Sequence, residues 1–154
     1  MTAYAAPSRL IAAYKEWLKP ADTAIPVAVS LNYRAHIKRT PAVLAAQQFW
    51  QRVDCAVHRS KVKRKGMRVP RACMLEGDGT ERNYHYHAMV ELPEGWTYKA
   101  FSELLLNTWE SLREAGRYTE IALCYDASGW MDYICKDMKI STDVLCLATS
   151  HRVV

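Results

Sequence analysis

Two stretches of the chain alternate apolar and polar side chains, which is the pattern of a β-strand with one buried face. In residues 25–33 the apolar set is Val27, Val29, Leu31 and Tyr33. In residues 84–92 the apolar set is Tyr84, Tyr86, Ala88, Val90 and Leu92. Two such strands predict a sheet with one face on a hydrophobic core and a second face that this core does not cover.

Segments with helical spacing of apolar residues separate the strands. We expect helices over residues 7–18, 40–57, 98–114 and 128–138, with the third closed by Gly116, and further strands over residues 68–76, 118–125 and 143–149. Pro70 marks its strand as an edge strand or as a strand entry. This order predicts an α+β fold, a split β-α-β (ferredoxin/RRM-like) antiparallel sheet with helices on one face and the active site on the open face.

The length of 154 residues suits a single domain. We expect an N-terminal packing helix within residues 1–22 and the core of the domain in residues 23–154. The apolar runs are too short to span a bilayer. The five cysteines form no C-x-x-C pair, and no secretory leader is recognised, so we interpret them as reduced thiols in a cytoplasmic protein.

The excess of positive charge is local. Residues 55–75 contain seven Lys and Arg and no Asp or Glu, whereas the whole chain has 21 basic and 16 acidic residues. The seven are Arg59, Lys61, Lys63, Arg64, Lys65, Arg68 and Arg71. Such a patch favours binding to a polyanion such as a nucleic acid, and the alternative is a solvated basic loop without a partner.

His85 and His87 lie two residues apart in the second alternating strand, so their rings are expected to point the same way. Two imidazoles directed at one point can bind a metal ion, and the alternative is an exposed or hydrogen-bonded pair. Glu76 completes a two-histidine, one-carboxylate set if the hairpin loop runs over residues 77–84. A shorter loop would bring Glu81 to that place instead.

A second cluster surrounds Tyr133. On a helical wheel, Tyr133, Lys136 and Asp137 share the side opposite an apolar stripe. A surface tyrosine beside a lysine is common and by itself indicates little. Beside a metal site the same pair indicates phosphoryl transfer, because that reaction needs a nucleophile and cations that stabilise the developing charge.

These clusters resemble the motifs of one nuclease group. The segment His85-Tyr86-His87-Ala88-Met89-Val90-Glu91-Leu92 is similar to the His-hydrophobe-His motif of the HUH endonucleases. The Tyr133–Lys136 spacing resembles the Tyr-x-x-Lys motif of single-tyrosine rolling-circle replication initiators (Rep proteins), and residues 29–33 resemble their loosely defined first motif. The residue between the histidines departs from the pattern because it is aromatic rather than aliphatic.

The resemblance implies a DNA-nicking and rejoining endonuclease that initiates rolling-circle replication. Glu76, His85 and His87 would hold Mn²⁺ or Mg²⁺, with Asp137 as a further candidate ligand. Tyr133 would attack the scissile phosphate of single-stranded DNA or an origin hairpin and form a 5′-phosphotyrosine, and Lys136 would stabilise the charge. The sequence contains no G-x-x-x-x-G-K-[ST] motif, so we expect either that the chain is the nuclease part of a longer protein or that a helicase acts in trans.

Three alternatives remain open. One is a relaxase or transposase of the same HUH group. Another is a non-catalytic RRM-like module that binds RNA or single-stranded DNA, which would need aromatic residues on the open sheet face. The third is a basic structural protein without chemistry. For the nucleophile itself, Tyr125, Tyr84 and Tyr86 compete with Tyr133, although the alternation places Tyr84 and Tyr86 toward the core.

Overall fold

The computed structural model describes residues 8–18, 24–77, 84–126, 129, 132, 146 and 148–151. The helices are α1 (Ser8–Leu18), α2 (Arg39–His58), α3 (Lys61–Lys65) and α4 (Tyr98–Glu110). The strands are β1 (Pro26–Tyr33), β2 (Arg71–Glu76), β3 (His85–Glu91) and β4 (Ala115–Leu123).

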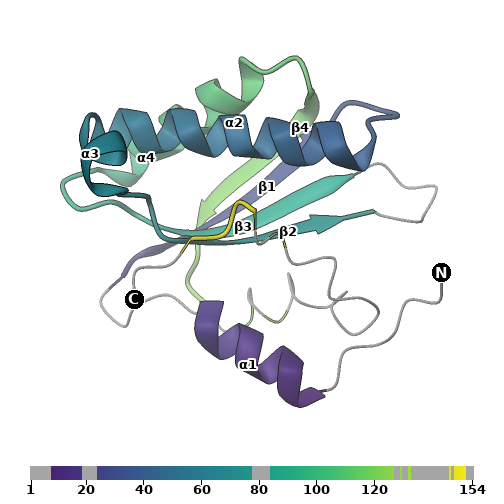
Figure 1. Ribbon diagram of the computed structural model, residues 1–154, viewed down its shortest axis with the longest axis horizontal. Coiled ribbons are helices and arrows are strands. Elements are labelled where there is room, and N and C mark those ends of the chain that lie inside the picture. The colour runs from purple at the N-terminus through teal and green to yellow at the C-terminus, as the bar shows by residue number, and fades with distance from the viewer. Residues whose placement is uncertain are drawn as a thin grey trace.

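The four strands form one antiparallel sheet in the order β2-β3-β1-β4. Because β3 and β1 are the central pair and each strand-helix-strand unit is split by a strand of the other unit, the topology confirms the split β-α-β prediction. Helices α2 and α4 cover one face of the sheet, and α1 lies on the other side (Figure 1). Among the parts of the chain that the structure describes, no helix has the length and apolar character needed to cross a membrane.

The core lies between the sheet and helices α2 and α4. The alternation of the two central strands is confirmed, because the residues predicted to face the core are buried there, including Val29, Leu31 and Tyr86. Trp50 of α2 donates a hydrogen bond from Nε1 to the Tyr86 hydroxyl at 2.9 Å, and Tyr33 donates to the carbonyl oxygen of Ala42 at 2.8 Å. The two buried phenols are therefore anchored to α2, and burial raises the pKa of both.

The bounds around Gly116 and the structure of the basic stretch differ from the expectations. Helix α4 ends at Glu110, and Gly116 belongs to β4 rather than closing the helix. A Cβ at residue 116 would lie only 2.7 Å from the carbonyl oxygen of Tyr33, where β1 and β4 change register, so the glycine permits this close approach. The basic stretch contains the short helix α3, which ends at Gly66 in the left-handed conformation. Pro70 does precede an edge strand, as predicted.

The described part of the predicted last strand follows the outer edge of β2 without forming a regular strand. Cys146 donates its backbone N–H to the Cys73 carbonyl oxygen at 2.9 Å, and His151 forms an isolated antiparallel bridge with Arg71. Ala148 and Thr149 lie in a turn. The other residues of the predicted strand, and those of the predicted helix 128–138 apart from the helical Gly129 and Asp132, lie outside the described residues.

Candidate functional site

Polar side chains form two rows across the sheet on the face away from α2 and α4. In one row Asn32 of β1 lies opposite His85 of β3, which lies opposite Glu76 of β2. In the next row Ser30 lies opposite His87. Strand β2 ends at Glu76 and β3 begins at His85, so the loop has the predicted bounds and Glu76 lies beside His85. We call the whole face of the sheet that carries these two rows, on the side away from α2 and α4, the histidine face.

Glu76 and His87 form a close pair. The Nε2 atom of His87 lies 3.3 Å from Oε2 of Glu76, and both side chains are about nine-tenths buried, at 11% and 10% exposed. On the other side of the ring, Nδ1 of His87 lies 3.0 Å from the Ser30 hydroxyl oxygen. The hydroxyl can donate or accept, so it satisfies either tautomer. When the proton is on Nδ1, the Nε2 lone pair and the carboxylate face one another, as two ligands of one cation do.

His85 is oriented by the adjacent row. Its Nδ1 atom lies 3.0 Å from the carboxamide oxygen Oδ1 of Asn32. Because that oxygen only accepts hydrogen bonds, Nδ1 carries a proton, and in the neutral ring the lone pair therefore lies on Nε2. Ser30 and Asn32 thus each contact one histidine from the directly opposite position of β1, although only the Asn32 oxygen selects the tautomer of its histidine. Partners of this kind fix the ring orientation of metal-binding histidines.

The structure brings only part of the predicted metal set together. Glu76, His85 and His87 share the histidine face, but within the described ranges no three His, Cys, Asp or Glu side chains converge tightly enough to hold an ion. Glu76 and His87 are paired, whereas His85 is held by Asn32 beside them. Glu81 and Asp137 lie outside the described residues. The two-histidine, one-carboxylate set therefore stays a prediction.

Tyr133 and Lys136 also lie outside the described residues, but Asp132, the residue before Tyr133, is described. Its carboxylate accepts a 2.6 Å hydrogen bond from Nζ of Lys15 in α1. Helix α1 lies on the side of the sheet that carries the histidine face (Figure 1). The chain therefore reaches this side of the sheet immediately before Tyr133.

The other candidate tyrosines differ in accessibility. Tyr86 is fully buried toward α2 and also contacts the Thr149 hydroxyl at 2.5 Å, and burial raises its pKa well above the ordinary value for a phenol. Tyr84 is partly buried and packs against the core. Tyr125, by contrast, is 95% exposed just beyond β4. Among the described competitors of Tyr133, Tyr125 is therefore the one whose side chain is fully open to solvent.

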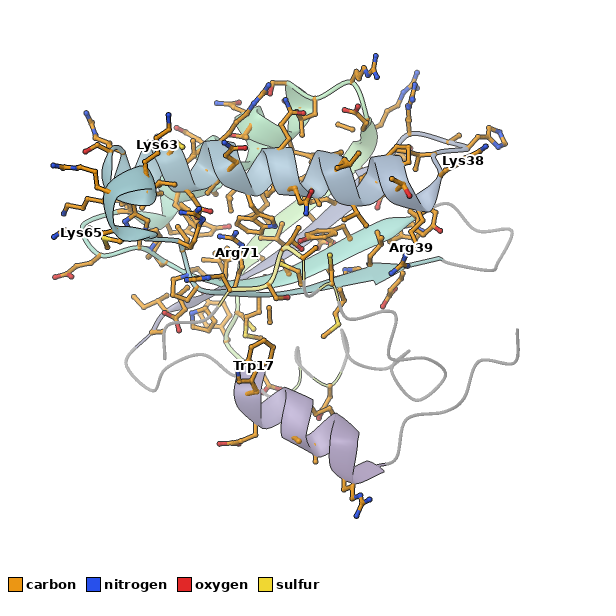
Figure 2. All side chains as sticks on the ribbon, viewed as in Figure 1. Trp17, Lys38, Arg39, Lys63, Lys65 and Arg71 are labelled. Carbon is orange, nitrogen blue, oxygen red and sulfur yellow. The ribbon has the colours of Figure 1, made fainter. Side chains whose placement is uncertain are left out.

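The histidine face is open on one half only. Over β2 and β3, Met74 and Met89 are buried, at 0% and 2% exposed, and Glu76 and His87 are nearly so. Along β4, Glu120 and Ala122 are exposed. Trp17, at the end of α1 nearest the sheet, lies on the side of the sheet away from α2 and α4 (Figure 2). Access to the Glu76–His87 pair is therefore expected from the β1–β4 half.

Five residues of the basic stretch form an exposed cationic surface at the end of α2: Arg59, Lys61, Lys63, Arg64 and Lys65. Figure 2 shows Lys63 and Lys65 at this end of the molecule. Val62 is buried and anchors α3 beneath them. Arg68 is half-buried, and its guanidinium donates to the carbonyl oxygens of Val62 and Met67 at 3.3 and 2.9 Å. We call the five exposed residues the α3 basic surface.

Arg71 does not belong to that surface, which corrects its assignment as a phosphate contact. It is buried on the helix side of the sheet, where Nη1 donates to Oδ1 of Asp54 at 2.8 Å and Nε donates to the Thr149 carbonyl oxygen at 2.7 Å. Its guanidinium carbon also lies 4.5 Å from the centre of a Trp50 ring. Arg71 thus connects α2, β2 and the turn at residues 148–149.

Replacing Asp54 by alanine is expected to lower the free energy of unfolding by about 3–5 kcal/mol, because it leaves a buried guanidinium without its carboxylate. Urea denaturation of the two proteins measures this change. Asp132→Ala is the matched control, because it removes an ion pair whose carboxylate side chain is 64% exposed, and it should cost at most about 1 kcal/mol. Equal losses for the two variants would contradict the structural role of Arg71.

The sequence predicted that His85, His87 and Glu76 lie together on one sheet face, which the register confirms, but it gave no individual role to Ser30 and Asn32. Their alternation placed both on the histidine face, yet only strand register shows that each lies opposite one histidine. Comparison of the chain with family models, with curated proteins and with solved structures finds no match.

Proposed function

We propose that the protein is a divalent-metal-dependent endonuclease that nicks and rejoins single-stranded DNA and so initiates rolling-circle replication. The observation that carries the proposal is the Glu76–His87 pair, whose ligand atoms lie 3.3 Å apart on the histidine face. The resemblance of the His85–His87 and Tyr133–Lys136 segments to the HUH and Tyr-x-x-Lys motifs supports the same reading.

The donor set suits a divalent cation. Imidazole nitrogens and a carboxylate oxygen bind Mn²⁺ more strongly than Mg²⁺. Nδ1 of His85 donates to Asn32 Oδ1, and Nδ1 of His87 can donate to the Ser30 hydroxyl oxygen, which corresponds to the tautomer that binds a metal ion through Nε2. Glu76, His85 and His87 would hold the ion, with Asp137 as an additional ligand. A bound cation polarises a phosphate and lowers the cost of the charge that develops on it.

Tyr133 supplies the nucleophile in this proposal. Its phenolic oxygen gives up its proton and forms a bond to the scissile phosphorus, and the bond from phosphorus to the 3′ oxygen breaks. That oxygen takes up a proton and leaves as a free 3′-hydroxyl, so the reaction releases no net proton. The product is a 5′-phosphotyrosine, and the reverse reaction rejoins the strand. Lys136, one helical turn after Tyr133 in the expected helix, is placed to stabilise the phenolate or the phosphate.

The α3 basic surface supports the choice of a nucleic-acid substrate. It gathers exposed cations at one end of α2, so it can contact several phosphates at once. Arg71 takes no part, because its guanidinium is buried against Asp54.

Replacing Lys63, Arg64 and Lys65 by glutamine is expected to flatten the dependence of DNA binding on salt, because fewer counterions are released. Each phosphate contact that is lost lowers the log-log slope by about 0.7 for a single strand. The measurement is a salt titration of fluorescence anisotropy, with the same change at Arg34, Lys38 and Lys99 as a control, since these cations are exposed elsewhere. An unchanged slope in the first variant would show that the α3 basic surface is solvated and contacts no phosphate.

A non-catalytic module that stacks bases on the sheet is less well supported. On β1 and β3, both fully described, the positions that alternate onto the histidine face hold no Phe, Tyr or Trp: they are Pro26, Ala28, Ser30, Asn32, His85, His87, Met89 and Glu91. Stacking modules use aromatic side chains on central strands, and here Tyr33 and Tyr86 are buried on the opposite face. A relaxase or transposase of the same group would share the chemistry proposed here and differ in its DNA substrate.

The test is to incubate the protein with a pool of random-sequence single-stranded oligonucleotides and Mn²⁺, then to run a denaturing gel. We expect a protein–DNA adduct that resists denaturation and is absent when EDTA is added. A single-stranded pool needs no unwinding, so no helicase is required. Protein that retains its mobility with Mn²⁺ and the pool would contradict the proposal, and the oligonucleotides recovered in the adduct would distinguish an initiator from a relaxase or transposase.

A further inference from the structure

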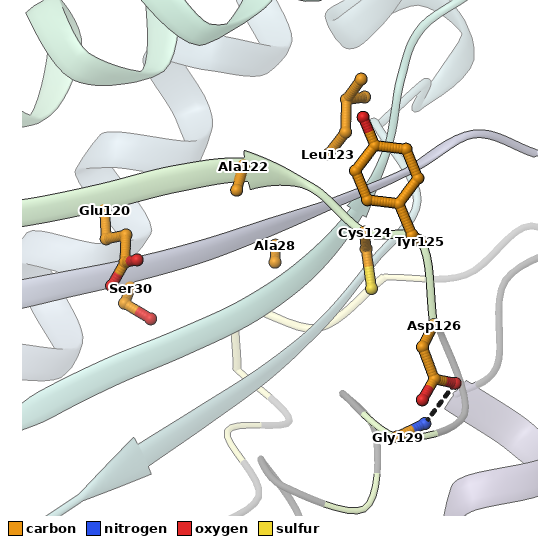
Figure 3. Close-up of a pocket in the computed structure, with 9 residues that line it drawn as sticks. All are labelled: Ala28, Ser30, Glu120, Ala122, Leu123, Cys124, Tyr125, Asp126 and Gly129. Carbon is orange, nitrogen blue, oxygen red and sulfur yellow. Dashed lines mark hydrogen bonds between the residues drawn. The ribbon is translucent and has the colours of Figure 1, made fainter.

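A cavity of about 420 Å³ opens on the accessible half of the histidine face (Figure 3). Its floor is made of the small side chains of Ala28 and Ala122, which lie directly opposite one another on β1 and β4. Glu120 and Asp126 stand at its margin, and Asp126 is held by the Gly129 backbone N–H at 2.9 Å. The cavity therefore combines a flat apolar floor with carboxylate acceptors.

The cavity adjoins the candidate catalytic pair. Ser30 lines it, and the hydroxyl of Ser30 lies 3.0 Å from Nδ1 of His87, whose other nitrogen faces Glu76. A molecule seated in the cavity is thus one side chain away from the pair. For a DNA strand whose phosphate lies at that pair, a neighbouring nucleotide is the part that reaches the cavity.

The charge of the lining selects which part of a nucleotide enters. Two carboxylates repel phosphate, so the sugar–phosphate backbone is disfavoured there. The alanine floor suits a flat base. Ionised carboxylates only accept hydrogen bonds, and cytosine offers an exocyclic amino group where thymine presents a carbonyl oxygen.

We propose that this cavity binds one unpaired base that carries an exocyclic amino group, cytosine rather than thymine, next to the cleaved phosphate. Its ligand class rests on the proposed function, because single-stranded DNA is the substrate assumed. Glu120 is the discriminating residue, and Ala28 and Ala122 provide the space.

The test compares the binding of oligo(dC) and oligo(dT) of equal length by fluorescence anisotropy. The wild-type protein should bind oligo(dC) about tenfold more tightly. Glu120→Gln should bring the two affinities close together, because the amide can also donate to thymine. Ala122→Leu fills the cavity and should remove most of the preference, whereas Ala100→Leu, at an exposed position of α4, should keep it.

Equal wild-type affinities for the two oligonucleotides would overturn the proposal, as would a preference that survives Ala122→Leu. Adduct formation with the random pool is measured on the same preparations. A cytosine preference without any adduct would contradict the nuclease but support the base site. If Ala122→Leu forms the adduct as fast as the wild-type protein, and the wild-type protein binds oligo(dC) and oligo(dT) equally, the base site is contradicted and the nuclease stays supported.

Discussion

Replacing both His85 and His87 by alanine is expected to abolish nicking and to weaken Mn²⁺ binding by more than a hundredfold. Loss of a residue that only orients a metal-binding histidine costs about 10–100-fold in metal affinity or activity, so loss of two ligands should cost more. The fold should persist, because both side chains are on the histidine face and the packing against α2 and α4 is unchanged. Calorimetric titration with Mn²⁺ and a nicking assay measure the two effects.

His58→Ala is the control, since His58 lies at the end of α2 away from the histidine face. It should nick and bind Mn²⁺ as the wild-type protein does. Nicking at the wild-type rate by the double variant would refute the metal assignment. Loss of activity in Glu81→Ala, with full activity in Glu76→Ala, would move the carboxylate ligand to Glu81.

The second large effect is expected at Tyr133. Tyr133→Phe should bind Mn²⁺ and single-stranded DNA normally and form no covalent adduct, because it lacks only the phenolic oxygen. A phenol has an ordinary pKa of about 10 and needs a cation nearby to attack as the phenolate. Lys136→Ala should therefore slow adduct formation without eliminating it. Single-turnover assays on denaturing gels separate the two outcomes.

Tyr125→Phe is the matched control for this experiment, because Tyr125 is exposed just beyond β4 and the substitution keeps its ring in the lining of the cavity. This variant should form the adduct at the wild-type rate. Loss of the adduct in Tyr125→Phe, with full reaction in Tyr133→Phe, would exchange the roles of the two tyrosines.

Much of the sheet was predictable because alternation is a local property. The alternation of apolar and polar residues in residues 25–33 and 84–92 predicts which residues face the core. It correctly placed Tyr86 toward the helices and His87 on the other face. The hairpin loop followed from Gly77 and the strands that flank it. These predictions needed no information about distant parts of the chain.

The features that sequence reasoning missed depend on contacts between distant segments. Arg71 looked like another member of a basic run, but its partner Asp54 lies on α2, and nothing local indicates that pairing. The contact between Ser30 and His87 depends on the register of β1 against β3, which the sequence does not show. Gly116 looked like the end of a helix, whereas it is required by the close approach of Tyr33.

The most direct test of the account is to isolate the adduct formed with Mn²⁺ and single-stranded DNA, digest it and map the modified residue by mass spectrometry. The account predicts a single 5′-phosphotyrosine at Tyr133. An adduct located at Tyr125, or at any residue other than Tyr133, would contradict it.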